Sequence, residues 1–206
     1  PIELAGTRSS PPVETTAGDM LEMGEVTNGY GGAASDKFGW NVSYAGDVNG
    51  DGYDDVIVGA PGVGSNNGAA YIFLGYPGFS TTNTTANLIK AANASVTING
   101  TGSGSFGWDV SDAGNVNGDS YADVIIGEPD NGNGKAYIFY GMGWNAFSKY
   151  YYTTASANVT LTGEASGDRF GASVSGAGDG NGGYDDVAVG APNADPGSVT
   201  NAGSVY

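Results

Sequence analysis

A long motif that occurs three times constrains this chain more than any other feature of its sequence. The first copy opens at Phe38-Gly39 and closes at Gly59-Ala60-Pro61, after a stretch rich in glycine and aspartate and a β-branched run. The second copy opens at Phe106-Gly107, 68 residues later, and the third opens at Phe170-Gly171 after a further 64 residues. Self-similarity at a nearly fixed period indicates a repeat architecture in which each copy is one structural unit.

Within one period the apolar and β-branched runs are short, and Gly, Asn and Asp separate them. In the first repeat these runs cover residues 38–45, 55–59, 70–75 and 95–100, and the second repeat echoes them. Four short strands joined by turn residues are typical of a propeller blade, and no segment shows a convincing helical pattern. The sequence therefore predicts an all-β fold of about three β-propeller-type blades, incomplete or completed by strand exchange or oligomerisation.

The repeats divide the chain into five expected parts. These are an N-terminal arm or linker at 1–21, an outer strand and connection at 22–37, a first repeat at 38–105, a second at 106–169 and a truncated third at 170–206. The third repeat reaches only its third strand, because 203–206 aligns with 68–71. We expect further chain, the strand at 22–29 or a neighbouring molecule to complete that sheet, since a bare edge needs cover.

Composition excludes several classes of function. The chain has six Lys and Arg residues and 22 Asp and Glu residues. The resulting formal charge of −16 argues against nucleic acid or an anionic lipid surface as a binding partner. The chain has no cysteine and no histidine, which removes thiolate nucleophiles, Ser-His-Asp triads and the usual zinc sites. No apolar run is long enough for a membrane span. Oxygen ligands are what remains for binding a cation.

The loop after the first strand of each repeat carries the candidate metal ligands. In the first repeat, oxygen donors fall at alternating positions: Asp47, Asn49, Asp51, the carbonyl of Tyr53, and Asp55. Six to eight oxygens suit Ca²⁺, whereas Mg²⁺ prefers a smaller site and keeps its waters. The pattern opens like an EF-hand loop, but its twelfth position is Val58 instead of Glu and the loop runs into a strand.

The second and third loops are weaker versions of the first. The second offers Asn115, Asn117, Asp119, the carbonyl of Tyr121, and Asp123, with two carboxylates instead of three, so we expect lower affinity. The third is one residue shorter and lacks a counterpart of Asp51, which leaves Asp179, Asn181 and Asp186 as candidates. The alternative is an ordinary tight turn, which prefers the same residue types, although two full copies in register favour metal binding.

Three separated parts of the motif together resemble a known family. Phe38-Gly39, the loop 47–55 and Gly59-Ala60-Pro61 are similar to the FG-GAP repeat of integrin α-subunit heads, also found in many bacterial and archaeal surface proteins. The resemblance covers about residues 22–206. It implies β-propeller blades with Ca²⁺ in the loop between the first two strands, bound by the positions named above.

This chain departs from the family pattern in three ways. Glu128 replaces the alanine of Gly-Ala-Pro in the second repeat, and the third loop is shortened. Integrin propellers have seven repeats and this chain shows three, so the resemblance does not lead us to expect a closed seven-bladed ring from one molecule.

The leading functional expectation is a non-enzymatic, extracellular or cell-surface module that binds Ca²⁺ and serves adhesion or self-assembly, as in a surface layer or filament. Its partner would be another protein or a second copy, bound through blade edges. One alternative is the non-catalytic propeller of a larger secreted enzyme. Another is a carboxylate-based enzyme acting on polysaccharides, with Glu128 as its best catalytic candidate. In a secreted chain, glycans are expected at Asn83, Asn93 and Asn158.

Two sets of aromatic residues have competing interpretations. Phe38, Phe106 and Phe170 recur at one place in every repeat, which favours core packing over ligand stacking. The run Tyr150-Tyr151-Tyr152 occurs once, and an aromatic cluster on an outer strand is favoured over an exposed contact patch.

Overall fold

The computed structural model describes residues 35–76 and 90–206, and its regular structure is almost entirely β. Its strands are β1 (Asn41–Gly46), β2 (Asp55–Ala60), β3 (Ala69–Phe73), β4 (Val96–Asn99), β5 (Val110–Gly114), β6 (Asp123–Glu128), β7 (Lys135–Phe139), β8 (Tyr150–Thr153), β9 (Val159–Thr162), β10 (Ser173–Gly178), β11 (Asp186–Ala191) and β12 (Ser204–Val205). Helical turns are limited in the described residues to α2 (Val63–Asn66), η1 (Ala91–Asn93), η2 (Thr154–Ser156) and η3 (Pro196–Ser198).

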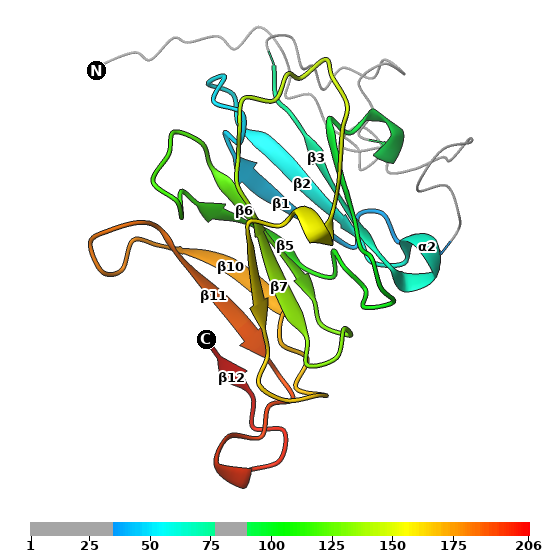
Figure 1. The fold of residues 1–206 in the computed structure, drawn as a ribbon, viewed down its shortest axis with the longest axis vertical. Helices are drawn as coiled ribbons and strands as arrows, with labels where there is room; N and C mark the ends of the chain where they lie inside the picture. Colours follow the sequence, from blue (N-terminus) through cyan, green and yellow to red (C-terminus); the bar gives the residue numbers. More distant parts are fainter. Residues whose placement is uncertain (1–34, 77–89) are drawn as a thin grey trace, which may run out of the picture.

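The strands form three sheets, each built mainly from one repeat. Blade 1 has the strand order β1-β2-β3-β4-β8, blade 2 has β5-β6-β7-β9, and blade 3 has β10-β11-β12. Figure 1 shows the blades side by side in chain order, from blue and cyan through green to orange and red. The prediction of an all-β fold of propeller-type blades is confirmed. The described sheets do not close into a ring, which matches an incomplete propeller.

A β-bulge ends the first strand of every blade and sets the direction of the loop that follows. The register shifts between Tyr44 and Gly46 in β1, between Asp112 and Gly114 in β5, and at the same place in β10. Gly46 and Gly114 have φ values of 74° and 71°, a region that favours glycine. The bulge therefore explains why glycine stands directly before each candidate metal loop.

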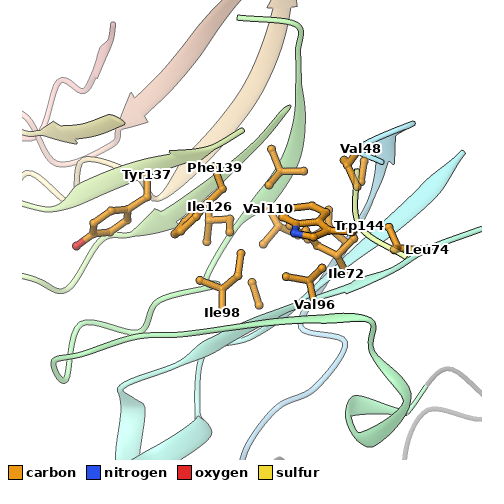
Figure 2. Packing of buried hydrophobic residues seen from close by; sticks show 14 of the residues in the cluster. Val48, Ile72, Leu74, Val96, Ile98, Val110, Ile126, Tyr137, Phe139 and Trp144 are labelled. Carbon is orange, nitrogen blue, oxygen red and sulfur yellow. The ribbon is translucent and has the colours of Figure 1, made fainter. Parts of the chain in front are cut away.

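The blades pack face to face through apolar side chains. The cluster between blades 1 and 2 includes Ile57 of β2. Figure 2 shows Ile72 of β3 in the same cluster with Val110 and Ile126 of blade 2. A second cluster joins blades 2 and 3 around Ile125 and Phe170. These clusters exclude water from both faces of blade 2, which makes the stack of blades one hydrophobic body.

Two of the three repeated phenylalanines lie in these clusters, and Phe38 packs against a separate apolar cluster within blade 1. Phe106 is fully buried and Phe170 is 4% exposed, while the half-buried Phe38 packs against Tyr71 with ring centroids 5.4 Å apart. Phe106 and Phe170 each form an isolated parallel bridge to the preceding blade, with Gly68 and Gly134. The preference for core packing over ligand stacking is confirmed.

The tyrosine run forms an outer strand, which lies in the sheet of blade 1 although it comes from the second repeat. β8 leaves the second repeat and pairs in parallel with β4 of blade 1, with Val96 opposite Tyr150 and Ile98 opposite Tyr152. Both tyrosine rings lie about 6 Å from the ring of Trp144, while Tyr151 is 68% exposed. The outer-strand interpretation holds, and the strand also ties the two repeats together.

Several expectations lie outside the described residues. They concern the arm at 1–21, the outer strand at 22–29 with most of the 22–37 connection, and the glycan at Asn83. The repeat boundaries at 106 and 170 stay predictions. Within the described ranges, no helix is long and apolar enough to cross a membrane.

Candidate metal centre

The loop between β1 and β2, here loop 1, wraps its backbone around the carboxylate of Asp47. One Asp47 oxygen accepts hydrogen bonds from the backbone amides of Gly50 and Asp51, at 2.8 and 3.0 Å, and the other accepts one from Gly52 at 2.8 Å. Three amides on one carboxylate draw the chain into a tight turn. This places the next oxygen donors on the inside of a single small loop.

Asn49 and Asp51 continue the same turn. The Asn49 side chain donates to Asp51 at 3.0 Å and to the backbone carbonyl of Trp144 at 3.1 Å. Asp51 in turn accepts from the backbone amide of Tyr53 at 3.0 Å. Loop 1 is therefore internally bonded, and Trp144 anchors it to the β7–β8 connection.

Asp55 is the most buried carboxylate of loop 1. It is 1% exposed, and its two oxygens accept from the backbone amides of Val48 at 2.8 Å and Gly75 at 2.7 Å. Burial raises the pKa of Asp55 to about 7; the two amide hydrogen bonds oppose this rise, and the charges of Asp47 and Asp51 add to it. The ionised form therefore lacks compensating positive charge.

The loop between β5 and β6, loop 2, repeats the design with one carboxylate fewer. Asn115 takes the place of Asp47 and accepts from the amide of Gly118 at 2.8 Å, while its own side-chain amide donates to the Asp119 carbonyl. Asp119 accepts from the backbone amide of Tyr121 at 2.7 Å. Asp123 is fully buried, accepts from Val116 and Gly141, and has a pKa raised by burial.

The loop between β10 and β11, loop 3, is more open. Asp179 accepts from the amides of Asn181, Gly182 and Gly183, and these hydrogen bonds lower its pKa. Asp186, which corresponds to Asp55 and Asp123, is only half-buried and accepts from Gly180 and the Asn181 side chain. Loop 3 brings its three candidate residues together by hydrogen bonding, although it lacks the buried carboxylate of the other two.

The donor chemistry of loops 1 and 2 fits a hard divalent cation. Carboxylates, amide oxygens and carbonyls are the oxygen ligands that Ca²⁺ takes, and a buried carboxylate is costly without a counter-charge. The ion pair found among the described residues, Arg169 with Asp130, does not involve these loops. In the described chain, however, no three acidic side chains converge closely enough to hold a metal. Backbone amides donate to the carboxylates of Asp47 and Asp55 instead. The ligand set therefore stays a prediction.

Each loop is also part of the seam between blades, which sequence reasoning did not reveal. The carbonyl of Asp47 accepts from the backbone amide of Ala122 in blade 2, and the Asp185 side chain of blade 3 accepts from the amide of Asn115. A Cβ atom at Gly50 would lie 2.7 Å from the ring of Tyr121. The conformation of each loop therefore affects how the neighbouring blade packs against it.

Glu128, the candidate for a catalytic carboxylate, lies inside the protein. It is fully buried at the end of β6, where it accepts from the Tyr137 hydroxyl at 2.5 Å and the Asn131 side chain at 2.7 Å. Its second oxygen has no hydrogen-bond partner. A polysaccharide cannot reach this carboxylate, so the geometry favours a structural role for Glu128.

We expect Glu128→Ala to lower the free energy of unfolding by about 1–3 kcal/mol, because it leaves the Tyr137 hydroxyl buried without an acceptor. Urea unfolding measures the change, and Glu128→Ala combined with Tyr137→Phe should recover part of it. Blade 1 provides the matched control: Ala60 stands where Glu128 stands, and the hydroxyl of Tyr71 already lacks a partner. Tyr71→Phe should therefore cost nothing, and a large loss there would contradict this account.

Comparisons with known proteins identify the repeats. The profile of the family described as FG-GAP repeat matches residues 38–73 and 106–139. Integrin alpha-6 of Gallus gallus is 35% identical over 176 residues, which is 82% of this chain and 15% of that protein. Integrin alpha-PS3 of Drosophila melanogaster is 32% identical over 206 residues, 95% of this chain and 18% of that protein. The chain thus spans less than a fifth of either relative.

Proposed function

Because this chain is an FG-GAP repeat protein that resembles the integrin α-subunit head, we propose that it is a non-enzymatic, Ca²⁺-binding propeller module for adhesion or self-assembly. The observation that carries the metal proposal is the carboxylate of Asp55, 1% exposed and without a cationic side chain in the described structure. A divalent cation in loop 1 would supply the missing positive charge.

The proposed ligands follow the loop positions. Loop 1 would hold Ca²⁺ through Asp47, Asn49, Asp51, the carbonyl of Tyr53, and Asp55, and loop 2 through Asn115, Asn117, Asp119, the carbonyl of Tyr121, and Asp123. In loop 3 the proposed ligands are Asp179, Asn181 and Asp186. The side chains would have to exchange some backbone amides for the ion. When bound, the ion would order the loops and fix the seam between neighbouring blades.

We further propose an extracellular or cell-surface location, which is supported by the similarity to integrin α subunits. Asn93, in η1, and Asn158, before β9, are both exposed and would be open to glycosylation. The Asn158 side chain accepts a hydrogen bond from the backbone amide of Tyr140 at 2.9 Å, which a glycan at this position would have to accommodate.

Thermal unfolding with Ca²⁺ and with EDTA tests the metal proposal. A ligand that binds only the folded state at one hundred times its dissociation constant stabilises by about 2.7 kcal/mol, so millimolar Ca²⁺ should raise the melting temperature. Asp51→Ala should reduce this rise more than Asp119→Ala, because loop 1 has three carboxylates and loop 2 has two.

Asp168→Asn is the matched control, since this acid lies outside all three loops, and it should leave the response to Ca²⁺ unchanged. Mg²⁺ at the same concentration should raise the melting temperature less than Ca²⁺. A melting temperature that is the same in Ca²⁺ and EDTA would refute the metal assignment.

A further inference from the structure

One segment of the second repeat contacts both loop 1 and loop 2. We define the crossover segment as residues 141–153, which come after β7 of blade 2 and end as β8 in the sheet of blade 1. Its first residue, Gly141, donates its backbone amide to the Asp123 carboxylate at 3.0 Å. Its second residue, Met142, donates its backbone amide to the carbonyl of Val48 in loop 1 at 2.9 Å. Two adjacent peptide groups therefore join the candidate metal loops of neighbouring blades.

The beginning of the crossover segment is closely packed between blades 1 and 2. A Cβ atom at Gly141 would lie 2.3 Å from the carbonyl oxygen of Ala122 and 2.5 Å from that of Val48. Ala122 also donates its backbone amide to the carbonyl of Asp47 at 3.1 Å. Because closely packed backbone transmits displacement, a change of conformation in loop 1 or in loop 2 reaches the same part of the crossover segment.

The crossover segment also fixes the side chain of Asn49, which is a proposed ligand in loop 1. The amide nitrogen of Asn49 donates to the carbonyl of Trp144 at 3.1 Å and to the Asp51 carboxylate at 3.0 Å, which uses both of its N–H groups. The amide oxygen faces its own turn, where it accepts from the backbone amide of Asp51 at 3.3 Å. A hydrogen bond to the far side of a ligand group sets the orientation of that ligand. Trp144 is therefore a positioning residue for Asn49.

The packing of the Trp144 side chain holds its carbonyl in place. The indole ring is 6% exposed and belongs to the apolar cluster between blades 1 and 2 (Figure 2). Its N–H donates to the hydroxyl of Tyr152 in β8 at 3.1 Å, and β8 pairs with β4. The orientation of Asn49 thus depends on a residue that lies 95 positions later in the chain, in the other repeat.

We propose that the crossover segment couples loops 1 and 2, so that a cation bound in either loop strengthens the binding of a cation in the other. This inference rests on the proposed Ca²⁺ sites and concerns their regulation. Asp123 can hold Gly141 and a cation together, because a carboxylate oxygen has more than one acceptor position. Asn49 ordered around a cation likewise holds Trp144. The first cation orders a segment that the second cation also requires, and the effect is reciprocal.

Asp119→Ala tests the coupling through the fluorescence of Trp144. Ca²⁺ should change the tryptophan emission of the parent chain, and Trp144→Phe should remove most of that change, since Trp40 and Trp108 precede β1 and β5 at the ends away from the loops. The Asp119→Ala chain has an intact loop 1, but the midpoint of its Trp144 signal should move to at least about fivefold higher Ca²⁺. Asp168→Asn should leave the midpoint unchanged.

A second pair of substitutions tests the bond from Asn49 to Trp144. Asn49→Asp raises the number of carboxylates in loop 1 from three to four, which by charge alone would tighten Ca²⁺ binding. It also removes the N–H groups and places a carboxylate oxygen against the Trp144 carbonyl, so the calorimetric affinity of loop 1 should fall at least about tenfold. Asn117→Asp is the matched control and should lower the affinity for Ca²⁺ much less. Asn117 makes the same bond within its loop, to Asp119 at 2.8 Å, and in the described structure none to the crossover segment.

Two results would overturn the proposal. An unchanged midpoint in Asp119→Ala means that the loops bind independently, and tighter binding by Asn49→Asp means that Trp144 does not position Asn49. Asp119 is exposed, so the melting temperature of Asp119→Ala in EDTA should stay near that of the parent chain.

The melting temperature and the emission together separate this proposal from the metal assignment. If Ca²⁺ raises the melting temperature while the midpoint in Asp119→Ala is unchanged, the coupling is wrong and the metal proposal stands. If Ca²⁺ changes neither the melting temperature nor the emission of the parent chain, the metal proposal itself fails, and the coupling fails with it.

Discussion

Gly127→Ala should lower the free energy of unfolding by about 3 kcal/mol or more, which corresponds to about 6–12 °C in melting temperature for a chain of this size. Gly127 lies in β6 at the face that packs on blade 3. A Cβ atom there would lie 2.0 Å from the carbonyl oxygen of Gly171. Backbone cannot move aside as a flexible side chain would, so the blades must separate.

Gly190→Ala is the matched control for this prediction. Gly190 occupies the same place in blade 3, and its nearest atom to an added Cβ is the Ser173 Cβ at 3.3 Å. The alanine should change the free energy of unfolding by no more than about 0.5 kcal/mol when measured on dilute protein. Equal losses at Gly127 and Gly190 would mean that the clash between blades 2 and 3 is not the cause.

Asp55→Ala should be the most damaging substitution in the metal loops, even in EDTA. It removes the acceptor for the backbone amides of Val48 and Gly75, both in or near the buried core of blade 1. Two unsatisfied amides at about 1–3 kcal/mol each give an expected loss of about 2–6 kcal/mol. Asp55→Asn keeps one hydrogen-bond acceptor and removes the uncompensated charge. In EDTA it should therefore lower the free energy of unfolding by less than half as much as Asp55→Ala.

Asp186→Ala is the matched control, because it also removes a loop carboxylate but one that is less buried than Asp55. Asp186 is half-buried and its bonds to Gly180 and Asn181 are exposed, so water can replace it at a cost of about 1 kcal/mol or less. Chemical denaturation in EDTA separates these effects from metal binding. A loss for Asp186→Ala that equals the loss for Asp55→Ala would show that burial does not set the energy of these carboxylates.

Much of the candidate site could be predicted because its chemistry is local. Asp47, Asn49 and Asp51 hydrogen-bond within their own turn, so their spacing alone places them in one loop. The burial of Asp55 was not predictable in the same way, since the residue also accepts a hydrogen bond from Gly75, twenty residues away and just after β3. Loops 1 and 2 look alike in sequence, and the anchor from Asn49 to Trp144 is visible only in the fold.

The role of Glu128, in contrast, could not be predicted from the sequence. Its departure from the Gly-Ala-Pro pattern singled it out as a catalytic candidate, but an acidic residue in a sequence carries no sign of whether water reaches it. The fold places it next to the connection between β4 and β5, where a Cβ atom at Gly104 would lie 2.7 Å from the Glu128 oxygen that has no hydrogen-bond partner. Burial and the bond from Tyr137 then make it a structural residue.

The sequence by itself determined the repeat, the all-β class, the inward phenylalanines and the oxygen-rich loops, because strand periodicity and turn chemistry act over a few residues. Only the tertiary structure decided which blade receives β8 and which carboxylates are buried. These properties depend on contacts between residues far apart in the chain. The same position of the repeated loop can therefore hold a fully buried carboxylate in blade 2, Asp123, and a half-buried one in blade 3, Asp186.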